Sequence, residues 1–156
     1  MKTFRAILTV CAWSWAAAGA AAPEYWPIDL GSLGGTNSEA LGVNDDRQVV
    51  GWSQDAAGRT QAFVWASGTM TGLGFLPGGT CSVANAINRR GDVTGYAAVS
   101  ATNVHAFLFS SNSLADLGTL GGPNSWGRAI NDQIEIGGSS QLVTNYPMSS
   151  PESFFW

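Results

Sequence analysis

The stretch L-G-S-L-G-G at residues 30–35 returns as L-G-F-L-P-G-G at residues 73–79 and as L-G-T-L-G-G at residues 117–122. Each copy is followed at a fixed offset by an aliphatic residue and an asparagine: Val43-Asn44, Ile87-Asn88 and Ile130-Asn131. Asn44 and Asn88 are 44 residues apart, and Asn88 and Asn131 are 43 apart. A period of this length is typical of propellers and solenoids, where one supersecondary unit buries its apolar faces against the next copy.

Each copy has the pattern of four short strands separated by turns. First strands are expected at residues 40–44, 84–88 and 127–131, and second strands at residues 48–53 and 92–97. The third strand is the most apolar and is expected at residues 61–65, 105–109 and 152–156. A fourth strand then leads into the next copy through residues 68–74 or 113–118. Helix is disfavoured, because the chain has 20 glycines and no sustained 3.6-residue periodicity beyond residue 20.

Four strands in about 44 residues is the size of a propeller blade. The sequence predicts an all-β fold of tandem four-stranded repeats at residues 29–71, 72–115 and 116–156, arranged as propeller-like blades, with a β-solenoid as the alternative. Residues 28–31 have the pattern of a fourth strand without a partner, and the third copy reaches only its third strand. Because propellers usually have at least ~4 blades, we expect an incomplete ring. It is either part of a longer array, which is favoured, or one half of a homodimer.

Two kinds of turn are expected. The hairpin turns end at Arg47, Gly91 and Ile134, and the glycine predicts a positive φ angle there. A β-branched isoleucine adopts that angle only at a cost, so the third copy is expected to be degenerate. The double glycines of the three copies are expected to form turns between blades.

The first 20 residues have the features of a secretory signal peptide. Lys2 and Arg5 precede an apolar run at residues 6–18, and small residues at positions 18–20 predict cleavage near Ala20. The mature chain then has five arginines, no lysine and eleven acidic residues, a net charge of −6. This charge argues against a nucleic-acid partner, and the 13-residue run is shorter than the ~20 residues of a membrane span. We expect a secreted, extracellular or periplasmic protein that is not inserted in the membrane after cleavage.

The residues that commonly carry chemistry are few in the mature chain, which has one histidine, one cysteine and no lysine. His105 with Asp92 or Asp116 is the only candidate general base, but its repeat position also accepts glutamine and glutamate. Cys81 occupies a turn position that is asparagine in the other copies. The Asn-Asp turns at residues 44–46 and 131–132 lack the alternating acids of a calcium loop, so turn chemistry explains them better. We therefore expect no enzyme, no catalytic residue, no cofactor and no metal.

One tryptophan is a candidate for a ligand-binding surface. Trp65 and Trp156 share a repeat position with Phe109, which predicts a place in the core. Trp126 aligns with Glu39 and Val83, and an indole ring at such a position is suited to stack on a sugar. Trp126 is therefore the predicted surface anchor for an unknown protein or glycan partner.

The order L-G-x-L-G-G, A-x-x-I-N, V-V-G and H-A-F-L-F resembles the extracellular repeat of the HAF family, named after the triplet found here at residues 105–107. The resemblance covers nearly all the mature chain, although residues 61 and 152 replace the histidine in the other two copies. It implies a secreted bacterial repeat protein with a propeller-like fold and no assigned activity. Two functions follow as hypotheses: a non-catalytic extracellular scaffold or binding module, or part of a longer secreted propeller hydrolase.

Overall fold

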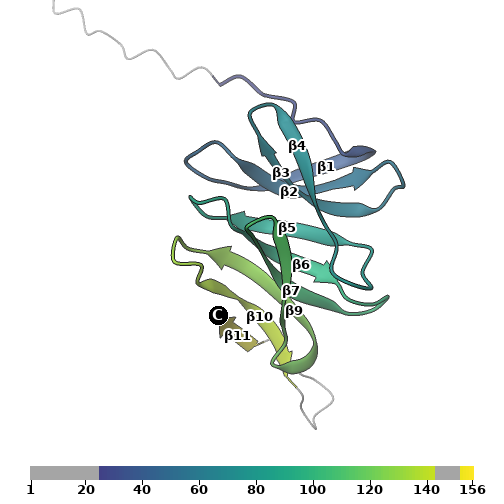
Figure 1. The fold of residues 1–156 in the computed structure, drawn as a ribbon, viewed down its shortest axis with the longest axis vertical. Coiled ribbons are helices and arrows are strands. Elements are labelled where there is room, and N and C mark those ends of the chain that lie inside the picture. The colour runs from purple at the N-terminus through teal and green to yellow at the C-terminus, as the bar shows by residue number, and fades with distance from the viewer. Residues whose placement is uncertain (1–24, 143–151) are drawn as a thin grey trace, which may run out of the picture.

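The computed structural model describes residues 25–142 and 152–156, which form an all-β protein. Within these residues there are 11 strands in three antiparallel sheets, and no helix occurs. The three sheets lie one above another along the long axis of Figure 1, so the first and third sheets form opposite ends of the stack. The predicted signal peptide lies outside the described residues. Within those residues, no helix has the length and apolar character needed to cross a membrane.

Each sheet follows the chain as a meander, in which every strand pairs with the next. The first sheet contains β1 (Gly34–Val43), β2 (Val49–Asp55), β3 (Thr60–Ala66) and β4 (Thr69–Gly74). The second contains β5 (Ser82–Ile87), β6 (Val93–Ala98), β7 (Val104–Ser110) and β8 (Ser113–Gly118). The third contains β9 (Gly121–Ile130), β10 (Ile136–Leu142) and β11 (Glu152–Phe155). The all-β class is confirmed. Ten of the strands lie at predicted positions, although β1 and β9 begin about six residues early, and β10 is not among the predicted strands. Residues 28–31, expected as a strand without a partner, do not form one.

The double glycines do not all form turns. In the first and third copies they are the opening residues of β1 and β9, so the expectation of turns is wrong there. In the second copy the additional residue Pro77 changes the local geometry, because proline and Gly78, with φ of 81°, form the two central residues of a tight turn. The main-chain N–H of Gly79 closes this turn on the carbonyl of Leu76 at 3.0 Å.

The hairpin turns do have the predicted positive φ at Gly91, where the angle is 87°. The corresponding Arg47 and Ile134 adopt 59° and 66°. Ile134 therefore holds the conformation that is costly for a β-branched residue. The three hairpins keep one shape even where the residue type is unsuited to it.

The main core lies between the first and second sheets. The first sheet contributes the fully buried Val50 and Ala62, and the second contributes Ile87, Val93 and Phe107. Strand β5 packs against strands of the first sheet, and β9 packs in the same way against strands of the second. Since apolar burial is the main stabilising contribution, the sheets depend on one another for stability.

Buried serines connect neighbouring sheets. On β5, the Ser82 hydroxyl accepts a hydrogen bond from the Ala62 N–H at 2.9 Å and donates to the Gly74 carbonyl at 2.7 Å. On β9, the Ser125 hydroxyl accepts from the Ala106 N–H at 2.8 Å and donates to the Gly118 carbonyl. Both hydroxyls satisfy main-chain groups at the point where the fourth strand of the preceding sheet ends beside the third.

Candidate functional site

Three asparagines lie at the hairpin turns between the first and second strands of each sheet. The Oδ1 atoms of Asn44, Asn88 and Asn131 each accept a hydrogen bond at 2.9 Å from the main-chain N–H four residues later. Asparagine favours such turns because its side chain reproduces a main-chain hydrogen bond. Of the aliphatic residues before these asparagines, Ile87 is buried and Val43 is exposed. The three turns nevertheless lie together, at the same end of every sheet.

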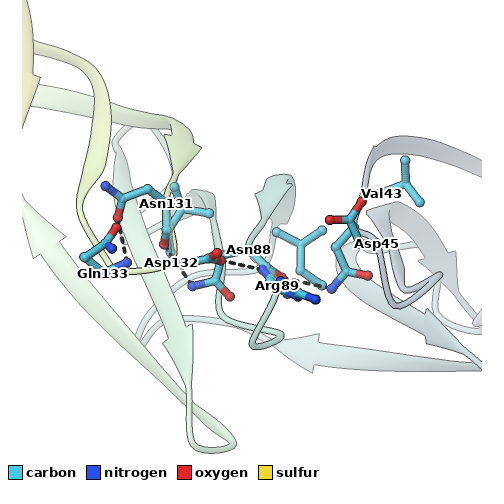
Figure 2. A pocket seen from close by; sticks show the side chains of 10 residues that line it. Val43, Asp45, Asn88, Arg89, Asn131, Asp132 and Gln133 are labelled. Atoms are coloured by element: carbon cyan, nitrogen blue, oxygen red, sulfur yellow. Dashed lines mark hydrogen bonds between the residues drawn. The ribbon is translucent and has the colours of Figure 1, made fainter.

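The Nδ2 atoms join these turns into a ladder (Figure 2). Asn44 Nδ2 donates to the carbonyl of Asn88 at 2.9 Å, and Asn88 Nδ2 donates to the carbonyl of Asn131 at 3.0 Å. Each Nδ2 also donates to the side chain four residues later, namely Gln48, Asp92 or Glu135. Both oxygen and nitrogen of these amides are thus engaged in holding turns and sheets together.

The turns surround a cavity of about 430 Å³, here called the asparagine pocket (Figure 2). Besides the asparagines, its lining includes Asp45, Arg89, Asp132 and Gln133. The Arg89 N–H donates to Asp132 Oδ1 at 2.9 Å, which links the second and third turns. Within the described residues, the side chains of Asp45, Arg89 and Gln133 have no hydrogen-bond partner, so they present two opposite charges and an amide at the pocket. Arg89 and Gln133 were not identified as pocket residues from the sequence. Their position was a usable signal, because Arg89 directly follows Asn88 and Gln133 is two residues after Asn131.

Comparison with protein-family models, curated proteins and solved structures finds no match to this chain. The character of the site therefore rests on its geometry alone.

In the Asn-Asp turns, the asparagine side chains hydrogen-bond to the main chain of their own turn. The asparagine oxygens accept main-chain hydrogen bonds, and one Asp132 oxygen does the same. Across residues 25–142 and 152–156, three or more histidine, cysteine, aspartate or glutamate side chains do not gather at any one place.

Asp92 supports the second turn and is nearly buried. Its carboxylate accepts hydrogen bonds from Ser110 Oγ at 2.6 Å and Asn88 Nδ2 at 2.9 Å, and Arg90 lies 3.4 Å away. Burial by itself raises the pKa of Asp92, but the hydrogen bonds and the Arg90 charge outweigh burial, so the pKa lies below its usual value. Asp92 is therefore a structural carboxylate and not a neighbour of His105.

His105 instead contacts Asp116. Its Nδ1 lies 2.9 Å from Asp116 Oδ2, and Asp116 Oδ1 accepts the Gly118 N–H at 2.7 Å. Of the two acids considered for a His105 dyad, the structure selects Asp116 and excludes Asp92. A carboxylate that orients an imidazole is one part of an acid–base arrangement. Neither residue of this pair lines the asparagine pocket.

Trp126 lies on β9 opposite Ser139 and is half-buried. In the other two sheets the aromatic residue stands on the second strand instead: Trp52 opposite Glu39, and Tyr96 opposite Val83. In the third sheet the aromatic residue thus stands on the first strand, with a serine opposite it on the second. Through this pairing Trp126 shares a sheet face with Ser139, and it is not part of the asparagine pocket.

Cys81 directly precedes β5 and is half-buried. Its carbonyl accepts the Ala98 N–H at 2.8 Å, and burial raises the pKa of its thiol. A raised pKa reduces the fraction of reactive thiolate at neutral pH. The main-chain hydrogen bond of Cys81 joins the residue before β5 to the end of β6.

Proposed function

We propose that this protein is an exported, non-catalytic β-repeat module, with propeller-like blades formed by its three sheets, that serves as an extracellular or periplasmic scaffold or binding module. Two series of hydrogen bonds support this most strongly, one formed by asparagine side chains and one by serine side chains. In each series, the same bond recurs in the next sheet after 43 or 44 residues. Such bonds allow one sheet after another to be added with the same contacts. The resemblance to HAF repeats agrees with this interpretation.

Recognition is assigned to positions that differ between the sheets. The residue after each ladder asparagine is Asp45, Arg89 or Asp132, so one polar framework presents a positive charge at the second turn and negative charges at the first and third. Loops presented by a rigid framework are common recognition surfaces. Arg89 and Asp45, with Trp126 on a separate surface, are the side chains we expect to distinguish a protein or glycan ligand.

A panel of soluble oligosaccharides, including cellohexaose, laminarihexaose and chitohexaose, tests the glycan reading by titration calorimetry and tryptophan fluorescence. If a sugar binds, Trp126→Ala and the double variant Asp45→Ser with Arg89→Ser separate the two surfaces, and Thr102→Ser in a distant loop is the control. Binding abolished by Trp126→Ala alone would assign the glycan site to the face of β9. Absence of binding across the panel would favour a protein ligand or a scaffold role.

The alternative, part of a longer secreted propeller hydrolase, is favoured by one observation, the His105–Asp116 pair. Assays with p-nitrophenyl esters and glycosides test it. Hydrolysis that is lost in His105→Gln, with unchanged circular dichroism, would overturn the non-catalytic proposal.

Export is tested separately. We expect N-terminal sequencing of secreted or periplasmic protein to begin near Ala21. Intracellular material that retains Met1 would contradict export without affecting the fold.

A further inference from the structure

The outer face of the first sheet has the features of a buried interface. In the second sheet, Ala84 is fully buried and Ile87 is 9% exposed, because both pack against the first sheet. The corresponding Ala40 on β1 is exposed and Val43 is 68% exposed. The same residue types are thus present on β1 without a covering sheet in the described part of the chain.

The third sheet has the complementary face. Ala62 and Ala106 are fully buried against the following sheet, whereas their counterpart Ser153 on β11 is exposed. Val64 packs against the core between the first two sheets, whereas its counterpart Phe155 is 70% exposed. A phenylalanine at this position offers a large apolar contact to a sheet placed beyond β11.

A cavity on the first sheet matches this aromatic side chain. Its volume is about 620 Å³, and it lies between the N-terminal segment of residues 26–30 and the ends of β1, β2 and β3. The apolar residues that line it are Trp26, Ile28, Leu30, Val43, Val49 and Trp65. Val43 and Val49 of this cavity correspond in the repeat to Ile87 and Val93. Val64 packs against the core cluster that contains Ile87 and Val93, in the interface between the first two sheets. The cavity is therefore the counterpart of the place that Val64 fills in that interface.

We propose that two copies of this chain associate head to tail, with Phe155 of one copy inserted into this cavity of the other. Strand β11 then pairs antiparallel with residues 28–31. The internal pairs Ala62↔Gly74 and Val64↔Thr71 set the register. Transferred to the interface, they place Ser153 opposite Gly31 and Phe155 opposite Ile28.

Two hydrogen-bonding groups are already positioned for this contact. The Ser38 hydroxyl donates to the Gly31 carbonyl at 3.0 Å, just as Ser82 donates to Gly74. Ser82 also accepts the Ala62 N–H, and Ser38 is expected to accept the Ser153 N–H of the second copy in the same way. At the other end of the ladder, Asn131 Nδ2 is expected to donate to the Asn44 carbonyl of the second copy.

A head-to-tail contact made twice closes two copies into a ring when it relates them by half a turn, and this closed form is the one inferred for the two copies. Figure 1 shows the two faces at opposite ends of the stack, so one copy does not satisfy itself. One pair opposes the contact: Glu152 occupies the position of His105, which faces Asp116, so Glu152 is brought close to Asp29. Repulsion between these two carboxylates reduces the affinity of the two copies for each other. Removal of one of the charges is therefore expected to raise that affinity.

Light scattering after size exclusion tests the association with the mature protein. We expect a dimer that Phe155→Asp dissociates, raising the dissociation constant at least about tenfold, while Leu120→Ser, which changes another exposed apolar residue, leaves it a dimer. Glu152→Gln is expected to tighten the dimer several-fold, since it removes the charge facing Asp29. A monomer at all concentrations, or a dimer unaffected by Phe155→Asp with native circular dichroism, would overturn the proposal.

Cysteine cross-linking tests the register independently, in a Cys81→Ser background. Directly opposite residues of antiparallel strands have Cα atoms about 4.5–5.5 Å apart, which suits a disulfide. Gly31→Cys combined with Ser153→Cys is expected to form an intermolecular disulfide under mild oxidation, and this pair keeps Phe155 in place. Asp29→Cys combined with Ser153→Cys, displaced by two residues, is the matched control. Equal cross-linking of both pairs, or of neither, contradicts the register.

Discussion

Strands β1 and β5 hold the same position in two sheets, yet β5 is nearly buried throughout and β1 is almost entirely exposed. Their sequences share the serine, the alanine and the aliphatic-asparagine pair. The difference arises from the neighbouring sheet, since the first sheet covers β5 while nothing in the described chain covers β1. Burial in this protein is therefore set by stacking between sheets, and matched substitutions in β1 and β5 measure what stacking contributes.

The largest difference is expected for the alanines. Ala84→Asp places a carboxylate at a fully buried position between two sheets and is expected to cost more than about 3 kcal/mol. Ala40→Asp, at the matching exposed position, is expected to change the free energy of unfolding by less than about 0.5 kcal/mol. Urea denaturation in a Phe155→Asp background keeps self-association out of the comparison. Equal losses at both positions would show that β5 is not stabilised by the first sheet.

The serines give a smaller contrast. Ser82→Ala leaves the buried Ala62 N–H without its acceptor and is expected to cost about 1–3 kcal/mol. Ser38→Ala removes one hydrogen bond at an exposed site, so its cost in the same background is expected to be below about 0.5 kcal/mol. Thermal unfolding measures both variants. A loss for Ser38→Ala as large as that for Ser82→Ala would contradict the comparison.

The sequence predicted most of the strands because each repeat alternates small and aliphatic residues between recognisable turns. It also predicted the positive φ at Gly91, since glycine at one copy of a turn reveals the conformation of all three. Local pattern is sufficient for such features, because they depend on residues that are close in the chain.

Other features depend on contacts that the repeat pattern does not contain. The opening glycines of β1 and β9 belong to strands because Gly34 pairs with Asp55 and Gly121 pairs with Leu142, outside the stretch with the alternating pattern. In the second copy, the inserted Pro77 makes a turn instead. The partner of His105 and the role of Asp92 depend on which strands become neighbours. The asparagine pocket needs three turns, 43 and 44 residues apart, to lie next to one another along one side of the stack.

A substitution in the third turn sharpens the comparison among the three hairpins. Ile134 has φ of 66°, whereas the second turn has glycine at the matching position. Ile134→Gly is expected to stabilise the protein by up to about 1 kcal/mol, because relief of the strained backbone exceeds the entropy cost of glycine. Gly91→Val is expected to destabilise it by more than about 1 kcal/mol, because valine is forced into positive φ. Melting temperatures that move in the same direction for both variants would refute the equivalence of the turns.

The smallest expected effect concerns pH and separates the first two hairpins. Position 92 holds a carboxylate, whereas the matching Gln48 does not titrate. The pKa of Asp92 is lowered in the folded protein, so its stabilising contribution is present above the unfolded pKa of about 3.9 and is lost as the pH falls through the folded value. Asp92→Asn keeps the size of the side chain but leaves one oxygen for the Ser110 and Asn88 donors. It is therefore expected to destabilise the protein at pH 6. The difference in unfolding free energy between the two proteins is then expected to shrink below pH 4, as the Asp92 carboxylate becomes protonated first in the unfolded chain and then, at lower pH, in the folded protein. A difference that stays constant from pH 7 to pH 3 would show that the Asp92 charge contributes nothing to the second turn.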